Sequence, residues 1–318
     1  MKNFRKNIIL TVMFGILLLF ILRFSAQAKE YAFLGLSVWF EQMIPSLLPF
    51  MIISSMLIQL GLDEILIKPI GGVLKMIYRI SDAGIYVLVM GFLCGFPMGA
   101  KAASMEYEEG KITKDEAEYL LTFTNNIGPV YFLSFVFGNI YDGIVVWKGL
   151  LFLYAIPLIY GILLRYTLYK HLPWQSSVPG KTSKGVNAGQ KKSFLTVMDT
   201  SINNGLSQIA MLGGYMILCN LLVMIPKILF ASNDHISALF HNLLEISGGL
   251  LAIRSLNLPA DAAFACAHAS LAFTGMSCHL QTFHILGHSG LSKQKYMLHK
   301  FILCSIVSIT LYLYMTFI

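Results

Sequence analysis

The stretch Gly91-Phe-Leu-Cys-Gly-Phe-Pro-Met-Gly-Ala-Lys101 decides how this chain folds, because it interrupts an apolar run that begins at Ile85. Within that run Gly95, Pro97 and Gly99 break the helical pattern, and Lys101 follows them. Non-helical backbone at membrane depth is tolerated only where protein or a water-filled cavity satisfies its polar groups. We therefore predict a broken membrane segment that forms half of a small-molecule site, as in many secondary transporters.

A second interruption, Asn125-Asn-Ile-Gly-Pro129, follows after a polar helix. That helix is expected to begin at Thr113-Lys-Asp-Glu116, which matches a capping box. The adjacent Asn125 and Asn126 bring four polar ends into an apolar region, which favours a site role. The alternative is that they cap the end of a helix.

The composition places the chain in a membrane. It has 318 residues, of which 56% are hydrophobic and 12% charged, and its mean hydropathy is +0.69, whereas soluble domains carry about 25% charged residues. We predict an all-α integral membrane protein, a multi-span helical bundle. The net charge of +7 is explained by basic residues beside apolar runs, which orient membrane segments, and nucleic acid is not expected as a partner.

Four regions are expected along the chain. Residues 1–30 hold a basic start and an apolar run, which is either a cleaved signal peptide or a retained first helix with a cytoplasmic N-terminus. Residues 31–164 form a first repeat, and residues 165–192 form a basic, Gly- and Pro-containing cytoplasmic loop. Residues 193–318 form a second repeat and end in a transmembrane helix.

The two repeats are inferred from three matches that occur in the same order. Ile44-Pro-Ser-Leu-Leu can be laid on Ile202-Asn-Asn-Gly-Leu, which contains Asn203, Asn204 and Gly205. The segment 95–101 can be laid on 248–254, and 127–129 on Thr274-Gly-Met276. Two repeats with inverted topology and broken helices would place a substrate between them near mid-membrane.

The second match pairs Lys101 with Arg254. A cation within a membrane segment costs a few kcal/mol and needs a cavity, a partner or a function, so two matched cations indicate an anionic substrate. The alternative is that each cation lies at a helix end and reaches the lipid headgroups. Gly95, Gly99 and the Gly248–Gly249 pair have their own alternative, which is close helix packing without a site.

His and Cys residues are concentrated near the C-terminus, and a metal site is one interpretation of them. His284 and His288 lie one helical turn apart, but Cys266-Ala-His268 is not a metal-finger spacing and carboxylates are sparse. Capping, interfacial hydrogen bonds or a proton-linked role is the preferred interpretation, and no metal or other cofactor is expected. No catalytic triad, carboxylate pair, nucleotide loop or dinucleotide fingerprint is present, so we do not expect an enzyme.

The blocks Gly95-Phe-Pro-Met-Gly-Ala-Lys101, Glu108 to Ala117 and Thr124-Asn-Asn-Ile-Gly-Pro129 resemble the YlbJ-type sporulation integral membrane proteins, of the nucleoside-recognition or Gate domain family. The resemblance extends from about Pro45 to the C-terminus and is looser in the second half. It implies a multi-span protein with inverted repeats in the cell membrane of a spore-forming bacterium, with the membrane that encloses the forespore as one candidate. For the sporulation branch of the family it implies transport of a small anion, dipicolinate, from the mother cell toward the forespore.

We accordingly expect a transporter or facilitator of a small organic anion, with the chain in contact with membrane lipid. A nucleoside or nucleobase transporter and a non-transporting sporulation scaffold are the alternatives. A coupling ion and a homo-oligomer are left open. The expected substrate-binding residues are Gly95, Phe96, Pro97, Gly99, Lys101, Asn125, Asn126, Gly128, Pro129, Asn203, Asn204, Gly205, Gly248, Gly249, Arg254, Thr274, Gly275 and Ser277.

Overall fold

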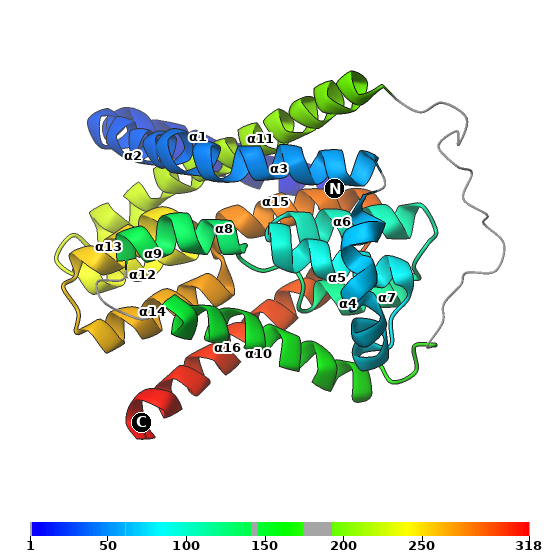
Figure 1. Cartoon of the computed structure of the whole chain (residues 1–318). Helices are drawn as coiled ribbons and strands as arrows, with labels where there is room; N and C mark the ends of the chain where they lie inside the picture. The colour runs from blue at the N-terminus through cyan, green and yellow to red at the C-terminus, as the bar shows by residue number, and fades with distance from the viewer. Residues whose placement is uncertain (1, 61, 141–145, 174–192, 318) are drawn as a thin grey trace.

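A computed structural model describes residues 2–60, 62–140, 146–173 and 193–317. Every regular element within these ranges is helical (Figure 1). By length and composition, five described helices could cross a membrane, or six if one bent pair counts as a single span. The prediction of an all-α membrane bundle is therefore confirmed, while the inverted repeats remain a prediction.

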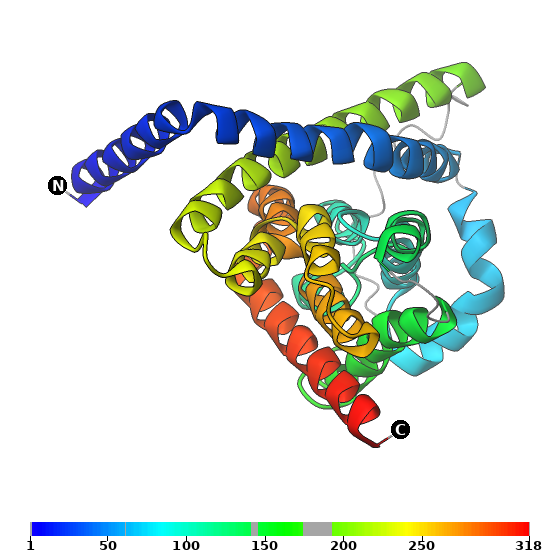
Figure 2. The same ribbon diagram turned by 90° about the vertical axis from the view of Figure 1, so that its left-hand side faces the viewer.

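One face of the bundle is formed by the N-terminal helices and by one very long helix. α1 (Lys2–Arg23) extends away from the bundle, with none of its apolar stretch buried (Figure 2). α2 (Ser25–Val38), the π-helical turn η1 (Trp39–Met43) and α3 (Ile44–Gln59) continue one another and pack antiparallel against α11 (Phe194–Leu229). Trp39 Nε1 donates to the Ile209 carbonyl at 2.8 Å, which fixes this pairing.

The first half of the interior consists of short helices. α4 (Asp63–Tyr78) and α5 (Asp82–Cys94) form the bent pair, with an angle of 104° between them. α6 (Met98–Glu108) and α7 (Lys114–Leu121) follow, and the chain then enters α8 (Pro129–Tyr131), η2 (Phe132–Val136) and α9 (Phe137–Ile140). Thr113 caps α7, and its hydroxyl accepts from the Glu116 amide at 3.2 Å, which confirms the expected helix start.

The second half repeats the use of short, interrupted helices. α12 (Asp234–Leu244), α13 (Ile246–Ser255), α14 (Ala260–Phe273) and α15 (Gly275–Ser289) follow one another with short connections. Two longer helices, α10 (Val146–Tyr166) and α16 (Lys293–Phe317), close the bundle on the side opposite α2 and α11 (Figure 2).

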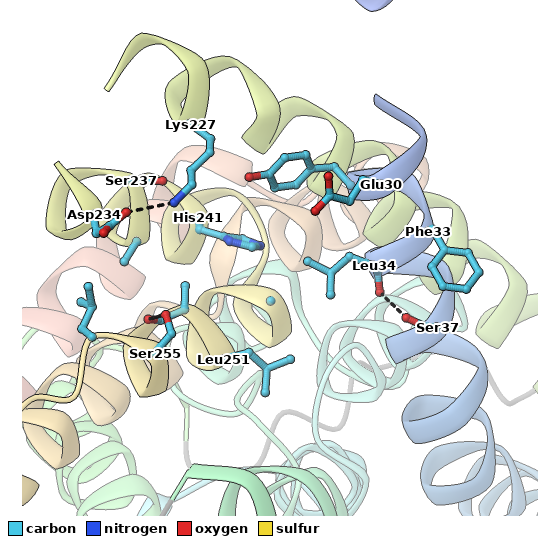
Figure 3. A pocket seen from close by; sticks show the side chains of 15 residues that line it. Glu30, Phe33, Leu34, Ser37, Lys227, Asp234, Ser237, His241, Leu251 and Ser255 are labelled. Carbon is cyan, nitrogen blue, oxygen red and sulfur yellow. Dashed lines mark hydrogen bonds and ion pairs between the residues drawn. The ribbon is translucent and has the colours of Figure 1, made fainter. Parts of the chain in front are cut away.

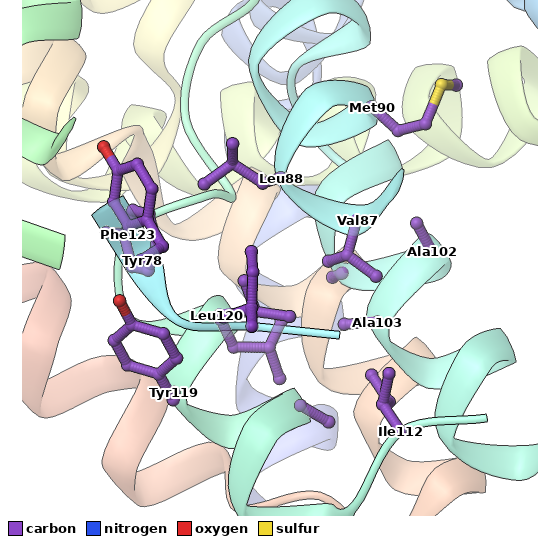
Figure 4. Close-up of a cluster of buried hydrophobic side chains, with 14 of the residues drawn as sticks. Tyr78, Val87, Leu88, Met90, Ala102, Ala103, Ile112, Tyr119, Leu120 and Phe123 are labelled. Carbon is purple, nitrogen blue, oxygen red and sulfur yellow. The ribbon is translucent and has the colours of Figure 1, made fainter. Parts of the chain in front are cut away.

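Two apolar cores hold these helices together. One core lies around α5, α6 and α7, where the rings of Tyr78 and Phe123 stack with centroids 5.5 Å apart (Figure 4). The other lies between the second break of the first half and α11, α13 and α14, and it contains Phe132, Leu250 and Leu271. The two cores leave the interrupted backbone segments between them as the polar part of the interior.

The residues at two expected boundaries, residue 30 and residue 165, lie within or at the end of helices. α2 runs through residue 30 without interruption. Most of the expected basic loop, residues 174–192, lies outside the described residues. Arg165 is not a solvated loop base: its side chain is buried and donates to the carbonyls of Tyr78, Arg79, Tyr169 and Leu172. A guanidinium has five donors, so it can join the end of α10 to the end of α4.

Candidate functional site

Four interruptions of helical backbone meet inside the bundle, and we call them breaks 1 to 4. Break 1 is residues 95–97 between α5 and α6, and break 2 is residues 122–128 between α7 and α8. Break 3 is Glu245 between α12 and α13, and break 4 is Thr274 between α14 and α15. The broken stretch that opens the sequence is thus one of four such segments.

Breaks 1 and 2 cross in direct backbone contact. Gly95 has a φ of +70°, a conformation that side chains rarely adopt. A Cβ at Gly95 would lie 2.2 Å from the Gly128 nitrogen, and one at Gly91 would lie 2.5 Å from the Thr124 carbonyl oxygen. The glycines are therefore required here for the close approach of two backbones, in addition to any role in the site.

Breaks 3 and 4 make the corresponding contact in the second half. Thr274 has a φ of +75°, and the following Gly275 has a φ of +74°. A Cβ at Gly275 would lie 3.1 Å from the Ile246 nitrogen, so the start of α15 packs on the start of α13. The side-chain Nδ2 of Asn242 donates to the Gly249 carbonyl at 2.9 Å and to the Ala238 carbonyl at 2.8 Å. The bond to Gly249 joins the end of α12 to the first turn of α13.

Breaks 1, 2 and 3 border one space of about 40 Å³, together with the first turn of α15, which follows break 4. We call this space the central cavity. A space of this size holds a few water molecules at most, whereas sites for organic ligands measure roughly 300–1,000 Å³. In the described conformation the centre of the bundle is therefore too small to hold an organic solute. The residues lining the cavity are Met43, Leu47, Cys94, Phe96, Ile127, Gly128, Tyr131, Leu212, Met216, Glu245, Ile246, Ser247, Ser277 and Cys278.

Glu245 is the charged group of the central cavity, and it is 1% exposed. Its carboxylate accepts from the Ser247 amide at 3.0 Å, from the Gly248 amide at 2.7 Å and from Asn220 Nδ2 at 3.3 Å. The carboxylate thereby caps the N-terminus of α13, where the helix dipole stabilises a negative charge. Beside it, the hydroxyls of Tyr131 and Ser247 lie 3.0 Å apart and join break 2 to break 3.

Ser277 supplies an unused polar atom on the opposite wall. Its side chain is 1% exposed. Apart from a weak contact with the Cys278 thiol, its hydroxyl has no hydrogen-bond partner among the described residues. A buried hydroxyl without a partner costs free energy. The cavity is therefore set up to satisfy this group with a bound molecule.

Behind the cavity, Asn125 is the centre of a buried network. Its carbonyl oxygen accepts from the Ala100 amide at 3.2 Å, which holds break 2 against α6. Its amide nitrogen lies 3.1 Å from the Thr282 hydroxyl and 3.2 Å from the Tyr296 hydroxyl. Tyr296 also contacts His279 Nδ1 at 3.1 Å. Break 2 is thus joined by side chains to α15 and α16.

Lys300 is the buried cation of this region, at 1% exposure. Its ammonium donates to Asn126 Oδ1 at 2.9 Å, and no carboxylate among the described residues lies within 4.0 Å of it. A charge inside a membrane is costly and marks a functional position by default.

A larger space of about 570 Å³, which we call the outer pocket, lies between α2, the end of α11, α12 and α13 (Figure 3). His241 points into it, and Lys227 pairs with Asp234 at 3.1 Å beside it. Its lining includes Gly248, whereas the preceding Ser247 lines the central cavity. The first turn of α13 is therefore the wall between the two spaces.

The structure brings together most of the expected site residues from the four breaks. Phe96, Gly128 and Ser277 line the central cavity. Those that form the break backbones or lie directly behind the cavity are Gly95, Pro97, Gly99, Asn125, Asn126, Pro129, Thr274 and Gly275. Gly248 and Gly249 lie in the first turn of α13 and contact His241 and Asn242 respectively.

The paired cations are not brought to the cavity. Lys101 is half-buried on α6, Arg254 is exposed on the last turn of α13, and neither lines the central cavity or the outer pocket. The reason is register: break 3 falls at Glu245, so Arg254 is the ninth residue of its helix and Lys101 the fourth. Nine residues of α-helix span about 13 Å, which carries Arg254 away from the break.

The expected pair Asn203 and Asn204 also lies elsewhere. Both side chains are exposed on the outer face of α11. The neighbouring Gly205 is buried against Leu48 and Ile52 of α3, where a Cβ would lie 3.0 Å from a side-chain carbon of Ile52. This segment therefore contributes helix packing, and the amides face away from the breaks.

Several polar residues at the site were not anticipated, and two of them carried a signal. Glu245 is the sole acid between Leu239 and Ile253, an apolar stretch in which a charge requires explanation. Lys300 directly precedes the apolar run 301–318, where a basic residue is also typical of the flank of a membrane helix. Asn220, His241 and Tyr296 lie in apolar or mixed helices and become interpretable only from their contacts.

Comparison with known proteins identifies one relative of this chain. No family model and no solved structure matches the chain. A curated relative, the sporulation integral membrane protein YlbJ of Bacillus subtilis (strain 168), is 30% identical over 202 residues, which cover 58% of this chain and 48% of the relative. The match thus spans about half the length of that relative. It confirms the expected similarity of this chain to the YlbJ-type sporulation integral membrane proteins.

Proposed function

We propose that this protein is a membrane transporter or facilitator of a small organic anion, with dipicolinate as its solute, in a membrane of a sporulating cell. The observation that carries the proposal is the meeting of three helix breaks, and of the helix that follows the fourth, at one small cavity. Broken helices that face each other inside a bundle are the usual way in which transporters build a substrate site. The link to sporulation rests on the similarity to a sporulation integral membrane protein.

The charge of the solute is argued from Lys300. A buried ammonium with one hydrogen-bond partner in the described part of the chain retains two free donors. A dicarboxylate that entered between the breaks would satisfy those donors, and the unpaired Ser277 hydroxyl would add a further bond. Because the cavity is too small for a dicarboxylate, transport on this proposal requires breaks 1 and 2 to separate from breaks 3 and 4. The proposed role is transport and not catalysis.

The test is uptake of labelled dipicolinate by proteoliposomes that contain the purified protein. Lys300→Met should reduce uptake by about tenfold or more, since a charge-assisted hydrogen bond contributes roughly 1.5–3 kcal/mol. Lys295→Met removes a partly exposed lysine of the same helix that pairs with Glu118, and it should leave uptake unchanged. Equal uptake by both variants would refute the assigned role of Lys300, and no uptake by the unmodified protein would refute dipicolinate.

A nucleoside is the second candidate solute, and Glu245 is the observation that favours it. An ionised carboxylate accepts hydrogen bonds, so it suits the hydroxyl groups of a ribose better than a second carboxylate. Competition by uridine against dipicolinate in the same uptake assay distinguishes the two solutes. Strong uridine uptake that Lys300→Met leaves intact would favour the nucleoside.

A further inference from the structure

Glu245 poses an electrostatic problem for an anionic solute. Its carboxylate borders the cavity into which the solute must fit, and like charges in a medium of low dielectric repel strongly. The three N–H groups that donate to Glu245 stabilise the ionised form of its carboxylate. Something must therefore neutralise Glu245 when an anion occupies the site.

We propose that Glu245 binds a proton that moves together with the solute, so that the protein is a proton-coupled symporter. This inference rests on the proposed transport function. The step is a simple protonation: a proton from water adds to a free lone pair of the carboxylate, one O–H bond forms, and the side chain changes from −1 to 0. Release on the other side of the membrane returns the same proton to water.

The geometry provides an acceptor for the new O–H group. The three N–H groups that bond to Glu245 are donors only, so none of them can accept a hydrogen bond from its protonated form. The Ser247 hydroxyl beside the carboxylate already bonds with Tyr131. Ser277, which lines the same cavity, has a buried hydroxyl oxygen without a partner of normal geometry. The cavity has room for a few waters between the two groups. A neutral Glu245 would thus donate to a group that is otherwise unsatisfied.

The geometry also provides access from the outer pocket. Asn220 Nδ2 donates to the Met216 carbonyl at 2.9 Å and to Glu245, so Asn220 Oδ1 must be the acceptor of its 3.0 Å contact with His241 Nε2. His241 therefore donates from Nε2 and presents its ring to the outer pocket. His241 and Asn220 are positioning residues that hold Glu245 close to the outer pocket.

A proton is favoured over a metal cation by the cavity lining. Direct coordination of a hard cation takes about six oxygen ligands, whereas the described lining is dominated by Met, Leu, Ile, Phe and Cys side chains. The described titratable groups that face Glu245 are Tyr131 of α8, Cys219 of α11 and Cys278 of α15. His241 of α12 contacts it through Asn220 and is itself affected by Lys227. Lys300 of α16 acts on Cys278 and His279.

The first experiment measures proton movement in proteoliposomes that enclose a pH-sensitive dye. Addition of dipicolinate should acidify the interior in the unmodified protein. Glu245→Gln, which resembles the protonated state, should retain exchange of labelled dipicolinate for unlabelled dipicolinate but lose the acidification. Glu116→Gln, a change in a buried carboxylate of the first half that accepts from the Ser81 amide, should retain both. Acidification that persists in Glu245→Gln, or uptake that follows a sodium gradient instead, would overturn the proposal.

The second experiment does not depend on any solute. Infrared difference spectra of the purified protein, recorded during a pH titration, should contain a protonated-carboxyl band that is absent in Glu245→Gln and present in Glu116→Gln. The absence of such a difference would overturn proton binding at Glu245 even if transport occurs. The presence of the band without any dipicolinate or uridine uptake would leave Glu245 as a proton site and refute the proposed transport function instead.

Discussion

The Nζ atom of Lys300 lies 2.9 Å from Oδ1 of Asn126, a contact that joins residues 174 positions apart in the chain. It connects the last membrane helix to break 2. Both side chains are buried, and the second polar end of Asn126 is used by a bond from its amide nitrogen to the Phe123 carbonyl. The bond therefore couples the position of α16 to that of break 2.

Removal of either partner should have different consequences. Asn126→Leu would leave the buried ammonium without its hydrogen-bond partner, which should lower the free energy of unfolding by roughly 1.5–3 kcal/mol. Lys300→Met removes the charge itself and should cost less, because a buried charge carries a desolvation penalty. The melting temperature of each variant in detergent measures the difference. A larger loss in Lys300→Met than in Asn126→Leu would contradict this account of the pair.

The crossing of breaks 1 and 2 should be intolerant of a single methyl group. Gly95→Ala would place a Cβ 2.2 Å from the Gly128 nitrogen at a φ of +70°, and we expect a loss of at least about 2 kcal/mol from backbone strain and overpacking. The matched control is Gly214→Ala in α11, where nothing lies within 4 Å of the new Cβ. Alanine is the better helix former there, so the control should be neutral or stabilising in the same thermal melt.

Arg165 should resist its conservative replacement. Arg165→Lys keeps the charge but cannot reach four carbonyl groups in the same geometry. We expect a loss of about 2 kcal/mol, with proteolysis near the α4 end increased. Lys170→Ala, at an exposed position five residues away, should change neither reading. A melting temperature for Arg165→Lys equal to that of the unmodified protein would show that the carbonyl contacts do not matter for stability.

The two versions of the solute site can be separated by variants at Ser277 and Arg254. Ser277→Leu adds an apolar side chain to a cavity of about 40 Å³, so it should block dipicolinate uptake by the proteoliposomes while the protein still reaches the membrane. Arg254→Ala should keep most of the uptake, because Arg254 lies on the exposed last turn of α13. The opposite ranking would return the substrate role to the matched cations.

Lys101 gives an intermediate test. It is half-buried on α6 and lies six residues after Gly95, close to break 1 in sequence but outside the lining of either cavity. Lys101→Ala should reduce uptake less than Lys300→Met does. An equal loss in the two variants would indicate that the open conformation brings Lys101 to the solute.

Much of the site was predictable because it depends on local chemistry. A glycine at a positive φ, a proline that starts a helix and a threonine that caps one act within a few residues, so Gly95, Pro129 and Thr113 could be interpreted from the sequence. The partners of Glu245 and Lys300 could not. A charge in an apolar stretch shows that a partner is needed, but the partner lies on another helix.

The sequence by itself therefore determined that this is a helical membrane protein with interrupted helices, because hydropathy and backbone breaks are properties of contiguous residues. The tertiary structure decided which breaks meet, and it replaced Lys101 and Arg254 by Glu245 and Lys300 as the charges nearest the centre. The physical reason is helix register. A shift of a few residues in where a break falls moves a side chain by several ångströms and turns it to another face, and only packing between distant segments fixes that shift.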